Sequence, residues 1–163
     1  MRYVVRIAGL ALLLPQLGLG MTGLGGDASV AVRALYQDSY CGSEDAGAVW
    51  LDDVKAATTF IRQNAKGLNP ESVEDIDWDE RAVVAVSMGN RATGGYAVRL
   101  DAEVGRVSDG VLTIPVDWQQ PGADAMTTQA ITQPCLVVSV PRGRYREVMV
   151  VDKAGTVRAS LAR

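Results

Sequence analysis

The chain has 163 residues, enough for one domain with a hydrophobic core, and 48% of them are hydrophobic while 21% are charged. This composition is ordinary for a globular protein and excludes a largely disordered chain. Without the first twenty residues, which hold two of the 16 basic residues and no acid, 14 basic residues stand against 19 acidic ones, a net charge of −5. An acidic chain without a basic cluster is unsuited to binding nucleic-acid phosphates, so no nucleic-acid partner is expected.

The N-terminal segment 1–20 has the three parts of a secretory signal peptide. Two arginines form the positive start, residues 7–14 are apolar, and Gly18 and Gly20 stand where a signal peptidase prefers small side chains. Cleavage after residue 20, or as late as residue 25, would leave a periplasmic or secreted protein. An uncleaved membrane anchor is the alternative, which Pro15 and the glycines disfavour. No cysteine stands close behind the apolar stretch, as a lipoprotein signal requires, so no lipid anchor is expected.

The next segments predict a strand and one helix. Apolar and other side chains alternate over residues 29–36, which is typical of a strand. A helix is predicted near 53–66, where apolar residues recur at helical spacing. Asp52 is placed to cap its N-terminus, because a carboxylate can accept from the first free backbone N–H groups. Gly67 is placed to end the helix.

An acidic turn follows this helix. Asp75, Asp77 and Asp79 have the spacing of the first three ligands of a calcium loop, but Glu80 stands where the loop needs Gly and Val86 where it needs Glu. A solvated turn is therefore the favoured interpretation, and no metal is expected.

Downstream segments predict strands joined by short connections. Residues 82–86 are apolar throughout, which indicates a strand buried on both faces. Over residues 96–100 apolar side chains alternate with others, which indicates a strand with one face in water. The sequence Ser108-Asp109-Gly110 is a hairpin signal before a strand over 111–118, where Pro115 indicates an edge position. A further strand is predicted at 136–140, and a last hairpin within 145–157.

We therefore expect an α+β fold over residues 27–163. It should contain about seven or eight mainly antiparallel strands, in a sandwich or barrel-like sheet, and the one helix near 53–66.

Two cysteines, Cys41 and Cys135, fall in the part that would be exported. The chain has no His, so a zinc site would lack its usual nitrogen ligand and a Cys nucleophile its usual base. One disulfide between them is the favoured interpretation in an oxidising compartment, and two separate buried thiols are the alternative. No cofactor is expected.

The stretch Gly89-Asn-Arg-Ala-Thr-Gly-Gly95 could in principle cradle a phosphate. It lacks the Lys-Ser/Thr pair of a P-loop, and a strand rather than a helix follows it. The simplest interpretation is a hairpin connection in which Gly94 or Gly95 adopts a positive φ.

The residues around this stretch carry a family resemblance. The sequence VVAVSMGNRATGGYAVRL (83–100) resembles the C-terminal domain of the PrcB family, the protease complex subunit, in its apolar strand, Met-Gly, x-Arg-x-Thr-Gly-Gly-Tyr and alternating strand. The sequences IDWDERAVVAV (76–86) and AITQPCLVVSVPRG (130–143) are similar to the steps that flank it. The resemblance covers about residues 29–145, although the chain lacks the family's frequent lipobox and has Cys135 where an aromatic residue is common.

This resemblance implies an exported, non-enzymatic module that binds or stabilises a protein partner such as a protease. The partner-binding loop it implies consists of Asn90, Arg91, Thr93, Gly94, Gly95 and Tyr96.

Two alternatives stay open. The 89–96 loop is also similar to the Asn-Pro-Thr-Thr-Gly-aromatic loop of chagasin-like cysteine-protease inhibitors, without its Pro, which would imply an inhibitor that inserts this loop into a protease cleft. Asp77 and Asp79 could instead form the carboxylate pair of a hydrolase, if they faced one cavity.

Overall fold

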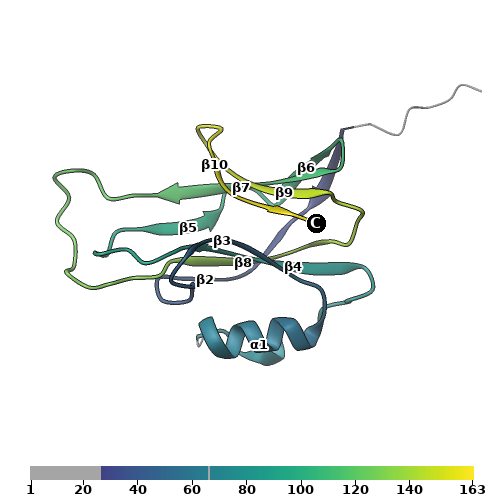
Figure 1. Ribbon diagram of the computed structural model, residues 1–163, viewed down its shortest axis with the longest axis horizontal. Helices are drawn as coiled ribbons and strands as arrows, with labels where there is room; N and C mark the ends of the chain where they lie inside the picture. The colour runs from purple at the N-terminus through teal and green to yellow at the C-terminus, as the bar shows by residue number, and fades with distance from the viewer. Residues whose placement is uncertain (1–26, 66) are drawn as a thin grey trace, which may run out of the picture.

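A computed structural model describes residues 27–65 and 67–163, which contain ten strands, one α-helix and one short 3-10 helix (Figure 1). The expected signal peptide lies outside the described residues. The strands are β1 (Ala28–Ala31), β2 (Arg33–Asp38), β3 (Ala46–Leu51), β4 (Arg81–Met88), β5 (Ala97–Leu100), β6 (Val104–Ser108), β7 (Val111–Gln119), β8 (Cys135–Pro141), β9 (Glu147–Asp152) and β10 (Val157–Ala162). The helices are α1 (Val54–Asn64) and η1 (Pro70–Val73). The expected α+β class is confirmed.

The strands form two sheets. The six-stranded sheet has the order β1-β6-β7-β9-β10, with β5 also paired to β7, and the four-stranded sheet has the order β2-β8-β4-β3. All pairs of named strands are antiparallel except β7 with β9, so the expectation of a mainly antiparallel fold is confirmed. Helix α1 covers the outer face of the four-stranded sheet (Figure 1).

Two hydrophobic cores explain the apolar runs in β4 and β8. Val84, Val86 and Leu136 point to the core between the two sheets, whereas Val83 and Val137 point to the core beneath α1. Successive side chains of a strand face opposite sides of its sheet, and here both sides are covered. The prediction that 82–86 is buried on both faces is thus confirmed, and each such side chain contributes roughly 1.5 to 3 kcal/mol by leaving water.

The helix begins one residue later than predicted. Asp53, and not Asp52, is the N-cap, and its Oδ1 accepts a hydrogen bond of 2.7 Å from the backbone N–H of Ala56. The C-cap is Ala65, whose N–H donates to the carbonyl of Ile61. The prediction that Gly67 ends the helix is therefore wrong. Gly67 lies beside Tyr36 instead, and a Cβ at this position would collide with the Tyr36 hydroxyl group.

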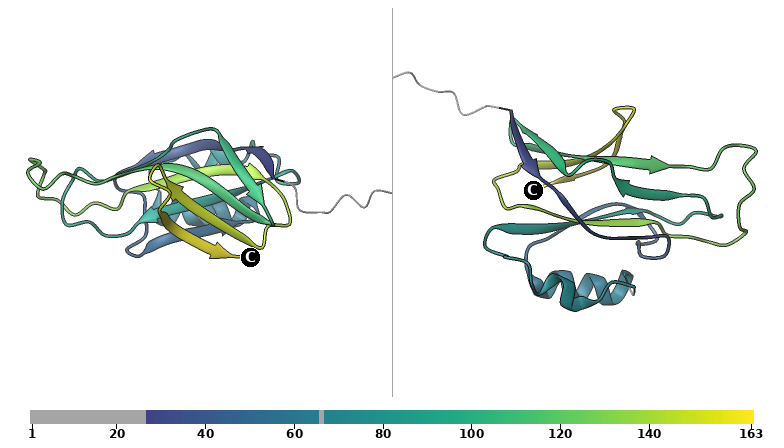
Figure 2. Two further views of the ribbon diagram at one scale, coloured as in Figure 1. Left: turned by 90° about the horizontal axis from the view of Figure 1, so that it is seen from above. Right: turned by 180° about the vertical axis from the view of Figure 1, so that it is seen from behind.

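The single strand predicted over 29–36 is in fact two strands in different sheets. The chain leaves the six-stranded sheet at Val32, which is fully buried and donates its N–H to the carbonyl of Glu103 over 2.9 Å. It then enters the four-stranded sheet as β2, and Figure 2 (right) shows this continuous segment passing from one sheet to the other. The local pattern predicted extended backbone correctly but carries no signal for the change of sheet.

The prediction that Pro115 marks an edge strand is wrong, because β7 is paired on both sides. Proline has no backbone N–H to donate, and the strand tolerates Pro115 because no neighbouring strand needs that donor. The Pro115 carbonyl accepts from Asp101 on the side of β5 and β6, so its nitrogen faces that side too. The ladder is interrupted there, between the residues of β7 that pair with β6 and those that pair with β5.

The two sheets also meet at β3 and β10, where Asp52 forms a cluster of polar contacts. Its carboxylate accepts from the indole N–H of Trp50 over 2.7 Å and from Arg163 over 3.3 Å, and it pairs with Arg142 at 3.5 Å. The Arg163 guanidinium lies 4.1 Å from the centre of the Trp50 ring, and Tyr145 packs edge-on against that ring. We call these five residues the Asp52 cluster.

Acidification should weaken the Asp52 cluster. The hydrogen bond from Arg163 holds the pKa of the Asp52 carboxyl below its usual value, and Trp50 acts in the same direction. A depressed folded-state pKa means that the contribution to stability is present above the unfolded-state pKa and is lost as the pH falls through the folded-state pKa. The side chain is 53% exposed, so solvent screening limits the expected loss to below about 1 kcal/mol.

Urea unfolding at pH 7 and at pH 3 in the wild type and in Asp52→Asn measures this effect. The variant should lose less free energy of unfolding than the wild type between the two pH values, and the difference should shrink in high salt. An equal loss in both proteins would contradict the assignment.

Candidate functional site

The 89–96 loop connects the two sheets rather than the two strands of a hairpin. It leaves β4 in the four-stranded sheet and enters β5 in the six-stranded sheet, so the expected hairpin connection is wrong. A positive φ was expected at Gly94 or Gly95, and Gly95 has it, at 86°. Gly89 also has a positive φ, 75°, where the chain turns out of β4.

The 120–134 loop, which precedes β8, holds the 89–96 loop along its length. Arg91 and Thr132 exchange both backbone hydrogen bonds, at 2.8 and 2.9 Å. The N–H of Gly94 donates to the carbonyl of Thr128 over 2.9 Å, and the Thr132 hydroxyl donates to the carbonyl of Thr93 over 3.0 Å. A Cβ at Gly94 would collide with the Thr128 hydroxyl oxygen, so a larger residue there would require the Thr128 side chain to move.

A third loop, residues 39–45, completes the arrangement. The N–H of Asn90 donates to the carbonyl of Glu44, and Gln133 joins two loops by donating its side-chain amide to Asn90 and its backbone N–H to Ser39. We call loops 39–45, 89–96 and 120–134 the loop cluster.

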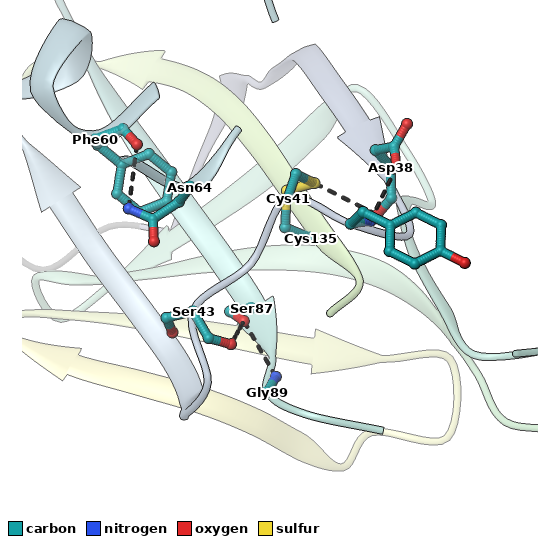
Figure 3. The surroundings of a disulfide bond; sticks show 9 residues. Asp38, Cys41, Ser43, Phe60, Asn64, Ser87, Gly89 and Cys135 are labelled. Atoms are coloured by element: carbon teal, nitrogen blue, oxygen red, sulfur yellow. Dashed lines mark hydrogen bonds between the residues drawn. A yellow bond between two sulfur atoms is a disulfide. The ribbon is translucent and has the colours of Figure 1, made fainter. Parts of the chain in front are cut away.

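The predicted disulfide between Cys41 and Cys135 is present and lies at the base of the loop cluster (Figure 3). It joins loop 39–45 to the first residue of β8, and both cysteines are buried. Beside it, the Ser87 hydroxyl donates to the carbonyl of Ser43 and accepts from the N–H of Gly89. The start of the 89–96 loop is thus held against the cross-linked loop.

The six residues predicted to bind a partner divide into two groups. Asn90 and Gly95 are exposed, whereas Arg91, Thr93, Gly94 and Tyr96 are partly buried. The Arg91 guanidinium donates to the carbonyl of Met88 over 2.6 Å and lies 5.4 Å from the centre of the Tyr96 ring. Arg91 and Tyr96 therefore hold the two ends of the loop together, and Asn90 and Gly95 face solvent.

The loop cluster also carries large apolar side chains that the sequence reasoning missed. Met126 is fully exposed, Ile131 is 69% exposed and Tyr40 is 62% exposed. The available signal was that Met126 and Ile131 are isolated large apolar residues in the otherwise polar stretch 119–133, where no strand or helix period accounts for them. Tyr40 and Gln133 form a β-bridge, which places Tyr40 beside the 120–134 loop.

The alternative acidic site is not assembled in the structure. Asp77 and Asp79 are both exposed, and Asp77 accepts the backbone N–H of Asp79 within a turn. A hollow of about 390 Å³ beside Trp78 is lined by Asp79 but not by Asp77, so the two carboxylates do not share it.

Within residues 27–65 and 67–163, no group of three or more His, Cys, Asp or Glu side chains is placed to hold a metal ion. No helix in the same part of the chain is long and apolar enough to cross a membrane.

Comparison with known protein families gives a match. The family described as PrcB C-terminal matches residues 82–141, which run from β4 to the end of β8 and include loops 89–96 and 120–134. No match was found among curated proteins or among solved structures.

Proposed function

This chain belongs to the PrcB C-terminal family, and from that premise we propose that residues 27–163 act as a non-catalytic module that binds a protein partner, such as a protease, through the loop cluster. The family's name associates it with a protease complex, and the family match spans two of the three loops of the cluster. The proposed role is to hold or stabilise the partner.

The observation that carries the proposal is the combination of exposed apolar side chains with a fixed backbone. Tyr40, Met126 and Ile131 are exposed on loops that are tied by backbone hydrogen bonds and by the disulfide. When a partner covers large apolar side chains on a surface, their removal from water makes the free energy of binding more favourable. A loop that is already held in place loses little conformational entropy on binding, so more of that gain appears as affinity.

Export forms part of the proposal. The predicted signal peptide and the Cys41–Cys135 disulfide both support a periplasmic or secreted location, since structural disulfides persist in oxidising compartments.

Partner capture tests the proposal. The tagged full chain is used as bait in the periplasmic and secreted fractions, and captured proteins are quantified by mass spectrometry. The double variant Met126→Ala/Ile131→Ala should recover at least about tenfold less partner, because two exposed apolar anchors are worth about 1 kcal/mol or more each at an interface.

The matched control is Val157→Ala. Val157 is a 50% exposed apolar residue at the start of β10, outside the loop cluster, and its substitution should leave recovery unchanged. Equal recovery by the double variant and the wild type would refute the loop cluster as the contact surface. If the captured protein is a protease, its activity with and without the chain separates a stabilising role from an inhibitory one.

A further inference from the structure

A groove of about 420 Å³ lies between β2 and β5, on the side of the molecule away from the Asp52 cluster. Residues 37–40 form one wall and residues 97–99 form the other. Its volume is within the range of ligand-binding clefts, roughly 300 to 1,000 Å³.

The groove exists because, in the described part of the chain, only one segment, β1 followed by β2, passes between the two sheets on this side of the molecule. β1 pairs with β6 in the six-stranded sheet, and then the chain leaves that sheet at Val32. Beyond this point β2 pairs only with β8, and β5 pairs only with β7, within the described residues. Each strand therefore has one edge without a neighbouring strand, and the groove lies between these two edges.

The β5–β7 ladder fixes which main-chain groups of β5 face the groove. Asp101 donates its N–H to the carbonyl of Pro115 over 3.1 Å, and these two residues form the next pair in the β5–β7 register. Hydrogen-bonded and non-hydrogen-bonded pairs alternate in an antiparallel ladder. Ala97 and Arg99 therefore bond to β7, while the N–H and C=O of Val98 point toward the open edge.

The same argument identifies Gln37 on the opposite wall. Met88 donates to the carbonyl of Pro134, so Pro134 and every second residue after it in β8 bond to β4. Cys135 lies between them in this alternation, bonds to β2, and lies opposite Asp38. Asp38 therefore faces β8, and the N–H and C=O of Gln37 point away from β8 toward the groove.

We propose that this groove binds an extended segment of a protein partner as an added β-strand. Among ligands, a polypeptide backbone repeats N–H and C=O groups at the spacing of a strand, and it can satisfy the main-chain groups of Val98 and Gln37 together. The proposal names the form in which a partner is held, and to that extent it rests on the proposed function. The groove shares residues 39 and 40 with the loop cluster but includes neither Met126 nor Ile131.

Charge and local regularity support a peptide as the occupant. Asp38 and Arg99, of opposite charge, are exposed one on each wall, so the groove selects neither an anion nor a cation. The β-bulge of β2 lies between Ala34 and Tyr36, and residues 36–38 are in regular register. The part of β2 that borders the groove is thus a regular edge that can accept another strand.

The test uses a library of random decapeptides displayed on phage, selected against the full chain, with binding of the synthesised peptides measured by fluorescence anisotropy. Gln37→Pro removes the N–H that points into the groove and leaves the hydrogen bonds between β2 and β8 in place. Gln37→Ala removes the side chain and keeps the N–H. We expect about tenfold weaker binding to the Pro variant and less than about twofold change for the Ala variant.

A second measurement does not depend on the variant folding. The backbone amide resonances of Val98 and Gln37 should shift on peptide binding, and N-methylation of alternate residues of the peptide should weaken binding by about tenfold or more, because it removes peptide N–H donors.

The proposal is overturned if no selected peptide binds, if the Pro and Ala variants bind equally, or if the selected peptides shift neither amide. A dimer of the chain that Gln37→Pro dissociates, without peptide binding, would assign the groove to a second copy instead. Peptide binding that depends on Gln37, with partner capture unaffected by Met126→Ala/Ile131→Ala, would retain the groove and reject the loop cluster. The reverse pattern would reject the groove alone.

Discussion

Replacing both Cys41 and Cys135 by alanine should lower the free energy of unfolding by about 4 to 5 kcal/mol. The two cysteines are 94 residues apart, and in the chain-entropy model a cross-link that closes a loop of this length removes that much conformational entropy from the unfolded state. The bond also fixes loop 39–45 to β8, so its removal should loosen the loop cluster as well. Guanidinium unfolding of the wild type, with and without reductant, and of the double variant gives the size of the effect.

The controls separate the cross-link from packing. Reductant should destabilise the wild type and leave the double-alanine variant unchanged, since only the wild type holds a bond to reduce. The intact wild type should have a mass two hydrogens lower than the reduced protein. A wild type whose unfolding midpoint is insensitive to reductant that fully reduces it would contradict the expected stabilisation.

The second large effect is expected in the core between the sheets. Leu136 lies in β8 and is fully buried, so Leu136→Ala should cost about 3 to 5 kcal/mol, through lost apolar burial and the cavity that is left. Chemical unfolding at pH 7 measures this cost.

Ile131→Ala, five residues earlier, is the matched comparison. Ile131 is 69% exposed, and its truncation should change the free energy of unfolding by less than about 0.5 kcal/mol. The two variants should also separate by function, because Ile131→Ala should weaken partner capture in a fully folded protein. A large loss of stability in Ile131→Ala would mean that the side chain supports the fold rather than a contact.

The parts of the fold that the sequence predicts well are those set by local pattern. The apolar run 82–86 in β4 predicts a strand buried on both faces, because no polar residue interrupts it. The run 136–140 in β8 predicts a strand, although Ser139 stands within it. The hairpin between β6 and β7 is also predictable, since Asp109 and Gly110 tolerate the positive φ values, 48° and 76°, that the tight turn requires.

The predictions that prove wrong concern features that depend on residues far away in the chain. Asp52 and Asp53 are equally good capping residues by type, and distant Arg142 and Arg163 engage the first of them while the second caps the helix. The break at Val32 is equally hidden, because extended backbone in one sheet and extended backbone in the next have the same local pattern.

The candidate site shows the same division. A family resemblance was enough to select the 89–96 loop, and its glycines predict the turn. The partners of that loop, Thr128 and Thr132, lie more than thirty residues later in a stretch without periodicity. Nothing local indicates that Met126 and Ile131 are presented beside it, since that follows from how the loops are tied together.

The position of β8 determines when this protein can fold. β8 is the strand that joins β2 to β4, and Arg33 at the start of β2 lies opposite Ser139, roughly one hundred residues later. Such pairings give a high contact order, which slows folding to the range of about milliseconds to seconds. During synthesis, β2 and β4 emerge well before the strand that connects them. A nascent chain shorter than about 140 residues therefore cannot assemble the four-stranded sheet, and folding must await the C-terminal third.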